Sequence, residues 1–279
     1  MNVFKMNQIA FSQAGVSAGS RAAKKRSPEL TLRKGRVFQV SRKPSNASIF
    51  LISFLTYLIG IFPSMVFALP SGGTVQAGSA TIDSVSSQQL TIHQATEKAI
   101  IDWQEFGIES AEHVDFQLSQ GGVTLNRVTG NNPSNIFGKL TSNGDLWLIN
   151  PNGVLFGNNA QVDVHGLMAT TSNISNADFL SGNYNFSVPS SLSSTVVNQG
   201  TITAAEGGLV ALVAPGVQNM GIINARLGKV SLASGRTFTV DLYGDQLINL
   251  GVDSQVMGQV TGMDGQALTS LVTNSGSIF

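Results

Sequence analysis

The sequence predicts an all-β solenoid, in which short strands coil around a common axis and stack as parallel sheets. Three observations predict this fold class. Residues 69–279 are dominated by Gly, Ser, Thr, Asn, Val, Ile and Leu and carry little charge. Long helical periodicity is missing there, since the best helical candidate, residues 95–99, is a single turn. Finally, a segment of about twenty residues repeats, which is typical of stacked β-coils.

The repeat is read most clearly in residues 198–204 (NQGTITA) and 219–225 (NMGIINA). Every Asn, Gly, Ile and Ala of the first segment recurs 21 positions later. A third copy starts at residues 274–278 (NSGSI) and stops where the chain stops. After a one-residue slip, further equivalent positions follow, namely Gly208, Val210 and Leu212 against Gly228, Val230 and Leu232.

Stacking explains why such a repeat is needed. A single coil cannot bury its apolar residues, whereas coils placed ~4.8 Å apart pair their backbones and align equivalent side chains. We therefore expect Ile202 to lie on Ile223, and Leu212 on Leu232, as inward-facing ladders. The Asn-x-Gly corners are expected to use positive φ. Residues 69–279 would make roughly ten coils, a rod of about 45–50 Å.

The ends of a solenoid expose strand edges and need covering. Residues 69–120 are less repetitive and hold seven acids, so we assign them to an N-terminal cap and the first coils. Residues Val272 to Phe279 begin a coil without completing it. Because open solenoid ends are unfavourable, we expect the natural polypeptide to continue or its gene to be truncated.

The first 68 residues differ from the rest in charge. They hold ten of the sixteen Lys and Arg and one acid, Glu29, whereas residues 69–279 hold six basic and fifteen acidic residues. A basic region, residues 1–48, precedes an apolar region, residues 49–67, which is the order of a secretory signal peptide. We predict an extended signal peptide, longer than the usual 15–30 residues, cleaved between Ala68 and Leu69.

A basic block and an apolar run could also indicate a nucleic-acid-binding patch or a transmembrane helix. A nucleic-acid-binding patch would normally belong to a folded or aromatic-rich face, and here the basic block leads directly into an apolar run. A transmembrane helix needs ~20 apolar residues, and the length would allow one. However, Pro63 would break that helix, and Val66-Phe67-Ala68 places small or modest side chains where signal peptidase cleaves. We expect export and no nucleic-acid partner.

Several segments resemble one family closely. They are residues 69–75 (LPSGGTV), 99–108 (AIIDWQEFGI), 125–130 (LNRVTG), 143–157 (NGDLWLINPNGVLFG) and 160–171 (AQVDVHGLMATT). Together they resemble the two-partner-secretion domain, the N-terminal haemagglutination activity domain of filamentous haemagglutinin and contact-dependent toxin exoproteins. The resemblance runs from about Leu69 to about Leu247. It implies a right-handed parallel β-helix with an N-terminal β cap and extra-helical strands.

The resemblance also implies a function. Such a domain is the secretion and folding module of a large exported adhesin, haemolysin or toxin, recognised by the periplasmic region of a cognate outer-membrane β-barrel transporter. The product would be secreted or held on the surface of a Gram-negative bacterium, and a downstream region would contact host or bacterial cells. An alternative stays open, a self-contained secreted β-helix that binds a surface or glycan.

The family motif Asn150-Pro151-Asn152-Gly153 is the main candidate site. Pro fixes φ, Asn can bond its own backbone and Gly tolerates positive φ, so the motif predicts a tight coil corner. Its functional interpretation is that the corner helps the transporter recognise the domain or starts β-helix folding. A second family block contains Asp102, Trp103, Asn126 and Arg127, and we expect Arg127 to pair with an acid and hold the cap.

No enzyme, metal or cofactor is expected. The candidate acids are scattered, and lone aspartates at turns are usually turn formers; they are Asp145, Asp163, Asp178, Asp241 and Asp245. The three histidines, His93, His113 and His165, lack metal-ligand spacing, and there is no cysteine. His165 is expected to face solvent. The glycine pairs at 72–73 and 207–208 lack the Lys-Ser/Thr of a phosphate-binding loop.

Overall fold

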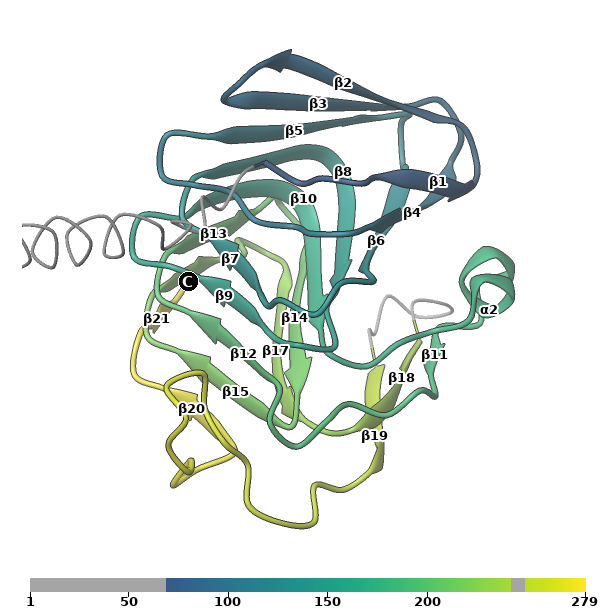
Figure 1. Cartoon of the computed structure of the whole chain (residues 1–279). Helices are drawn as coiled ribbons and strands as arrows, with labels where there is room; N and C mark the ends of the chain where they lie inside the picture. Colours follow the sequence, from purple (N-terminus) through teal and green to yellow (C-terminus); the bar gives the residue numbers. More distant parts are fainter. Residues whose placement is uncertain (1–68, 242–248) are drawn as a thin grey trace, which may run out of the picture. The chain divides into compact units, whose positions relative to one another are not determined.

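A computed structural model describes residues 69–241 and 249–279. The predicted signal peptide, including Ala68, and Asp245 lie outside the described residues. The described part is a parallel β-helix of about six turns with about 3% helix, so the predicted fold class is confirmed (Figure 1). No helix in this part of the chain is long and apolar enough to cross a membrane.

Three walls of mostly parallel strands surround the axis. The first wall contains β2 (Ala80–Ser86), β3 (Gln89–Gln94), β5 (His113–Leu118), β13 (Thr201–Ala204), β16 (Ile222–Asn224) and β21 (Ser277–Ile278). The second contains β1 (Thr74–Ala77), β4 (Lys98–Trp103), β6 (Val123–Val128), β14 (Leu209–Ala214) and β17 (Lys229–Ser234). The third contains β7 (Ser134–Ile136), β9 (Val154–Phe156), β12 (Thr195–Asn198), β15 (Gly216–Asn219) and β20 (Val272–Asn274).

Two long strands join the first and second walls. They are β8 (Lys139–Ile149) and β10 (Gln161–Thr170). The first half of β8 pairs with β5 and its second half with β6, and β10 divides in the same way between β13 and β14. This continuity is why the two walls form one sheet of 13 strands.

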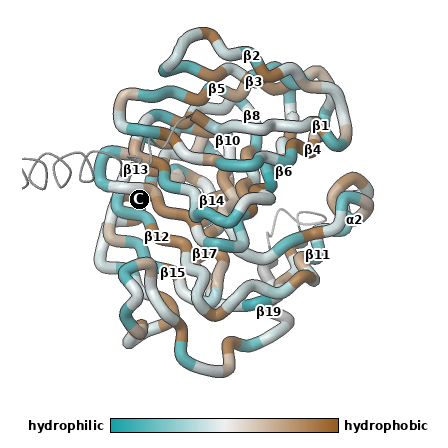
Figure 2. Tube along the Cα trace, viewed as in Figure 1, coloured by the Kyte–Doolittle hydropathy of each residue, from teal (hydrophilic) through white to brown (hydrophobic). Residues whose placement is uncertain are grey.

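The predicted ladders are present. Ile202 pairs with Ile223, and Leu212 pairs with Leu232, in parallel register. The third copy of the repeat continues the stack, because Ile223 also pairs with Ile278. Alternating side chains therefore point inward and form one apolar core along the axis, while their neighbours face outward. Hydrophobic and hydrophilic residues accordingly alternate along the coils of the backbone trace (Figure 2).

The predicted number of coils is wrong: the helix has about six turns and not ten. Three excursions use residues without adding coils. β2 doubles back antiparallel on β3, the first-wall strand that stacks in parallel on β5. Residues 171–194 leave the stack and form α2 (Asn176–Ser181) and β11 (Asn185–Phe186). Residues 235–241 and 249–271 include β18 (Thr237–Asp241) and β19 (Asn249–Ser254), which with β11 make a separate antiparallel sheet.

The Asn-x-Gly corners also differ from expectation, because Gly200, Gly221 and Gly276 are not among the glycines with positive φ. Glycine is needed there for close approach of the backbones. A Cβ on Gly221 would lie 2.1 Å from the carbonyl oxygen of Gly200, and one on Gly276 would lie 2.0 Å from that of Gly221. No side chain can occupy such a position without moving the preceding coil.

The asparagines of these corners form a ladder of side-chain hydrogen bonds. Asn198 Nδ2 donates to Asn219 Oδ1 at 2.8 Å, and Asn219 Nδ2 donates to Asn274 Oδ1 at 2.7 Å. Asn198 and Asn219 are fully buried. Because a buried amide without a partner is costly, the ladder favours stacking that places Asn over Asn.

Gly221→Ala tests the role of close approach. The added methyl group must push two coils apart, so we expect the free energy of unfolding to fall by about 1–3 kcal/mol. Urea denaturation of the chain would show a lower midpoint. Gly251→Ala is the matched control, since an added Cβ there meets nothing within 4 Å. Equal midpoints for the two variants would contradict this account of the corner glycines.

Candidate functional site

The Asn150–Gly153 corner joins β8 of the second wall to β9 of the third. The amide of Gly153 donates to the carbonyl oxygen of Asn150 at 3.0 Å, which closes a four-residue turn. Gly153 has a φ of 113°, a conformation that a residue with a side chain adopts only with strain. Pro151 is exposed, and Asn150 is fully buried.

The Asn150 side chain fastens the corner to the preceding coil. Its Nδ2 donates to the carbonyl oxygen of Asn132 and to Ser134 Oγ, both at 3.0 Å. Its Oδ1 accepts from the backbone amide of Asn152 at 2.9 Å. Asn152 Nδ2 in turn donates to the carbonyl oxygen of Gly130 at 2.9 Å. The two asparagines therefore connect the turn to residues 130–134, one coil earlier.

The following coil contacts the same corner. Ser194 Oγ donates a hydrogen bond to the carbonyl oxygen of Pro151. The Asn150 amide donates to the carbonyl oxygen of Thr170, the last residue of β10, at 3.0 Å. Most polar groups of the motif are thus used to hold neighbouring coils in register, and Pro151 is its most exposed residue.

The second family block lies on adjacent strands, β4 and β6, and contributes to both faces of the wall. Trp103 Nε1 donates to Asn126 Oδ1 at 2.9 Å, and both side chains are buried inside the solenoid. On the outer face, Arg127 Nη1 lies 3.0 Å from Asp102 Oδ1. This ion pair is mostly shielded, since the side chains of Arg127 and Asp102 are 12% and 22% exposed.

Arg127 pairs with an acid within residues 69–120, Asp102, and it also holds a segment that was not expected. Besides Asp102, its guanidinium donates to Asn173 Oδ1 at 2.8 Å, Asn176 Oδ1 at 2.9 Å and the carbonyl oxygen of Ile174 at 2.9 Å. These acceptors belong to the excursion after β10 and not to the N-terminal residues. The reason is positional: Arg127 points outward from the second wall, and that excursion covers this face.

Each histidine lies near a carboxylate, which the sequence pattern did not reveal. His165 Nδ1 lies 2.6 Å from Asp145 Oδ1, and His93 Nε2 lies 3.8 Å from Asp83 Oδ2. His113 Nε2 lies 2.8 Å from Thr141 Oγ1, which also donates to Asp115 Oδ1. The offset of about one coil, 20 residues between Asp145 and His165, is the signal that could have predicted that pair.

Burial is the main reason why the pKa of His113 lies below its ordinary value. The neighbouring Lys139 charge lowers this pKa further, and Asp115 acts in the opposite direction. The lowered pKa favours the neutral form of His113, which lies on the outer face of the first wall.

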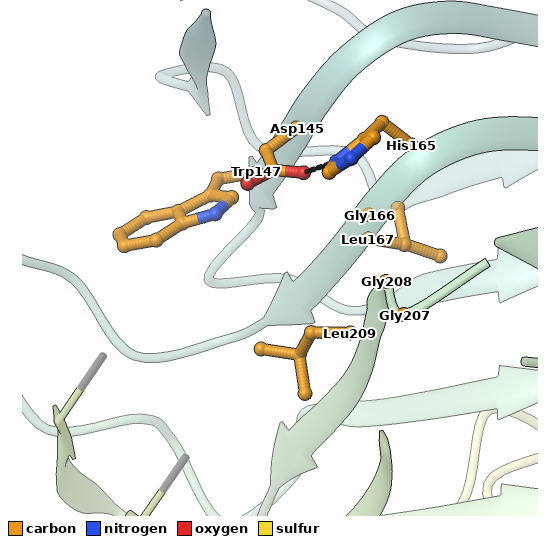
Figure 3. A pocket seen from close by; sticks show the side chains of 8 residues that line it. All are labelled: Asp145, Trp147, His165, Gly166, Leu167, Gly207, Gly208 and Leu209. Carbon is orange, nitrogen blue, oxygen red and sulfur yellow. Dashed lines mark hydrogen bonds and ion pairs between the residues drawn. The ribbon is translucent and has the colours of Figure 1, made fainter. Parts of the chain in front are cut away.

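The Asp145–His165 pair borders a cavity of about 120 Å³ between successive corners (Figure 3). Trp147, Leu167 and Leu209 supply its apolar lining, and the remaining lining residues are Gly166, Gly207 and Gly208. An imidazole held by a carboxylate can assist a nucleophile, but the lining of this cavity offers no hydroxyl or thiol group next to His165. No cluster of three or more potential metal-ligating side chains occurs in residues 69–241 and 249–279.

The other candidate acids do not converge on a site. Asp163 faces outward on β10, and Asp241 ends β18. Asp178 lies in the first turn of α2, where its amide donates to Ser175 Oγ at 3.0 Å. Hydrogen bonds from Ser175 and Asn183 lower the pKa of Asp178. Ser175 is the N-cap of α2, and the Asp178 carboxylate accepts a hydrogen bond from Ser175 Oγ at 2.6 Å, so Asp178 supports the cap.

Asn150→Ala should destabilise the fold more than loss of an exposed asparagine. The substitution leaves the carbonyl oxygen of Asn132 and the amide of Asn152 without these partners, at a cost of about 1–3 kcal/mol. Urea denaturation measures the difference. Asn158→Ala, in an exposed turn of the same coil, should cost less than about 0.5 kcal/mol. Similar losses in both variants would show that the Asn150 contacts do not matter.

Comparison with known proteins places this architecture in a family. The model of the TPS secretion domain matches residues 67–278. Two proteins of Haemophilus influenzae, each named heme/hemopexin-binding protein, are similar in sequence. One is 35% identical over 204 residues, which cover 71% of this chain and 22% of that protein. The other is 42% identical over 110 residues, which cover 39% of this chain and 12% of that protein.

A solved structure agrees with the sequence comparison. The crystal structure of the HMW1 secretion domain from Haemophilus influenzae superposes with a TM-score of 0.64 at 31% identity, covering 75% of this chain and 53% of that one. The described residues share its β-helix fold. Since the family model spans most of the sequence, the chain belongs to the TPS secretion domain family.

Proposed function

We propose that this chain is the secretion and folding module of a large exported exoprotein, recognised in the periplasm by a cognate outer-membrane transporter. The match of residues 67–278 to the TPS secretion domain carries this proposal. The heme/hemopexin-binding relative shares only 22% of its length with this chain. We therefore assign secretion to the shared part, and contact with host or bacterial surfaces to other regions of the exoprotein.

Coil-by-coil folding is the mechanism that the contacts support. Transport across the outer membrane has no ATP available, so direction must come from another source. A coil that has stacked outside the cell buries its apolar side chains and fixes its corner, and cannot slide back through a narrow pore. The corner at residues 150–153 contacts the coils before and after it, so an error there would interrupt stacking on both sides.

The same contacts favour a folding role for the corner over direct recognition. Asn150 is buried and Asn152 donates to a neighbouring coil, so these amide groups are engaged within the domain. A transporter that met the folded domain would reach mainly Pro151. No enzymatic role is proposed, because the family that matches is defined by secretion and not by a reaction.

The proposal includes removal of residues 1–68 as an extended signal peptide. N-terminal sequencing of the secreted protein should find Leu69 as the first residue, because Val66-Phe67-Ala68 follows an apolar run. Retention of residues 49–68 on the mature protein would identify that run as a membrane anchor instead.

Asn152→Ala combined with Gly153→Val tests the corner during export. The valine must adopt the positive φ of Gly153, at a cost of about 1–3 kcal/mol, and the link to Gly130 is lost. When the full chain is expressed with its transporter, extracellular protein should fall at least several-fold, while periplasmic protein accumulates or is degraded. Asn158→Ala with Asn159→Ala, two exposed residues of the next turn, is the matched control.

A pull-down with the periplasmic region of the transporter separates the two roles of the corner. Loss of secretion with retained binding would assign the corner to folding, whereas loss of binding would make it part of the recognition surface. Secretion of the double variant at the level of the control would show that residues 150–153 serve neither role.

A further inference from the structure

Residues 173–186 form a segment that runs outside the coil stack, and we call it the strap. It begins after β10, contains α2 and β11, and precedes β12, where the chain returns to the coils (Figure 1). The α2 helix is short and well capped, with Ser175 at its N-terminus and Gly182 in the left-handed conformation at its C-terminus.

The strap covers the outer face of the second wall. Phe179, Tyr184 and Phe186 surround Trp147 of β8, with ring centroids 5.4, 4.7 and 5.9 Å from the tryptophan ring. Phe179 and Phe186 are fully buried, and Tyr184 is 5% exposed. Together with apolar residues of β4, β6 and β10 they form a second hydrophobic core, distinct from the one along the axis.

One end of the strap is fastened to the first coils. Arg127 of β6 binds Asn173, Ile174 and Asn176 through the hydrogen bonds described above. Lys98 of β4 donates from Nζ to the carbonyl oxygens of Phe179 and Leu180 at 3.1 and 3.2 Å. These carbonyls end a helix, where a cation offsets the partial negative charge of the dipole.

The other end of the strap is fastened to β18, a strand that lies much later in the sequence. β11 pairs with β18, with Asn185 opposite Thr239 and Phe186 opposite Phe238. The two phenylalanine rings are stacked, with centroids 4.3 Å apart and planes 8° from parallel. Near this junction, Ser172 Oγ donates to the carbonyl oxygen of Arg236 at 2.9 Å.

These contacts connect coils that are not neighbours. In a solenoid each coil normally contacts only the next one, so an end can fray without disturbing the rest. The strap contacts β4 and β6 at one end and β18, which follows β17, at the other, while β8, β10 and β14 lie between them.

We propose that the strap is a non-local staple, which makes the stack unfold as one unit and closes only once β18 is in place. Arg127 and Lys98 hold its first half, and Phe186 on Phe238 holds its second half. The staple is a property of the folded domain, and it would act whether or not a transporter recognises the chain. During export it would lock the first coils only after residue 241 has emerged.

Native-state hydrogen exchange on the full chain, at increasing urea below the unfolding transition, tests the staple. In the wild-type chain, amides of β4 and β18 should exchange through the same opening, with the same dependence on urea. Arg127→Met releases the first half of the strap. We expect β17 and β18 amides to exchange at least tenfold faster, through a smaller opening, while β8 and β10 amides change less than about twofold.

Two further variants keep the result decisive. Asn176→Ala removes one strap partner of Arg127 while leaving its pair with Asp102, so it should give a weaker form of the same pattern even if Arg127→Met fails to fold. Arg226→Met, at an exposed corner, is the matched control and should leave all strands unchanged.

Two outcomes would overturn the staple. Faster exchange confined to β4, β6 and residues 173–176 would mean that Arg127 acts only on its immediate surroundings. An equal acceleration of every strand would mean that the coils still unfold together without the strap contact, so that their cooperativity has another origin.

Discussion

Close parallel stacking of one coil on the next holds this fold together, and the corners, the ladders and the excursions all follow from it. It pairs the backbone of each coil with the coils above and below and lines up equivalent apolar residues such as Ile202, Ile223 and Ile278. It also dictates the corners. At Gly221 and Gly276, a Cβ would lie about 2 Å from the backbone of the preceding corner, so only glycine is accepted there.

Polar side chains secure this stacking at the places where strands end. The Asn198–Asn219–Asn274 ladder and the Asn150 cluster differ in geometry but act alike, since each satisfies buried amides only when neighbouring coils are in register. A shift of one or two residues in the register between stacked coils would leave such groups without partners, a cost that apolar contacts alone would not impose. For a domain whose family is defined by secretion, register that is fixed coil by coil would suit the folding during export that we propose.

The excursions supply what a stack of similar coils lacks. The β2–β3 hairpin contributes antiparallel pairing at the N-terminal end, and the strap buries the apolar outer face of the second wall. Both basic residues that hold the strap, Lys98 and Arg127, come from early strands, whereas its aromatic partner Phe238 comes from a late one. The domain thus combines local stacking with a few contacts between distant parts of the chain.

The coil architecture could be predicted from the amino-acid sequence, because the 21-residue offset and the spacing of Ile and Leu are periodic signals that can be detected in the sequence itself. The Asn150–Gly153 turn could be predicted as well, since Pro, Asn and Gly restrict backbone angles locally. The number of turns, the Asp145–His165 pair and the strap contacts of Arg127 became apparent only in three dimensions. Those features depend on which residues the excursions remove from the stack and on side chains that meet across coils. Local sequence determines neither the distance nor the direction in space between such residues.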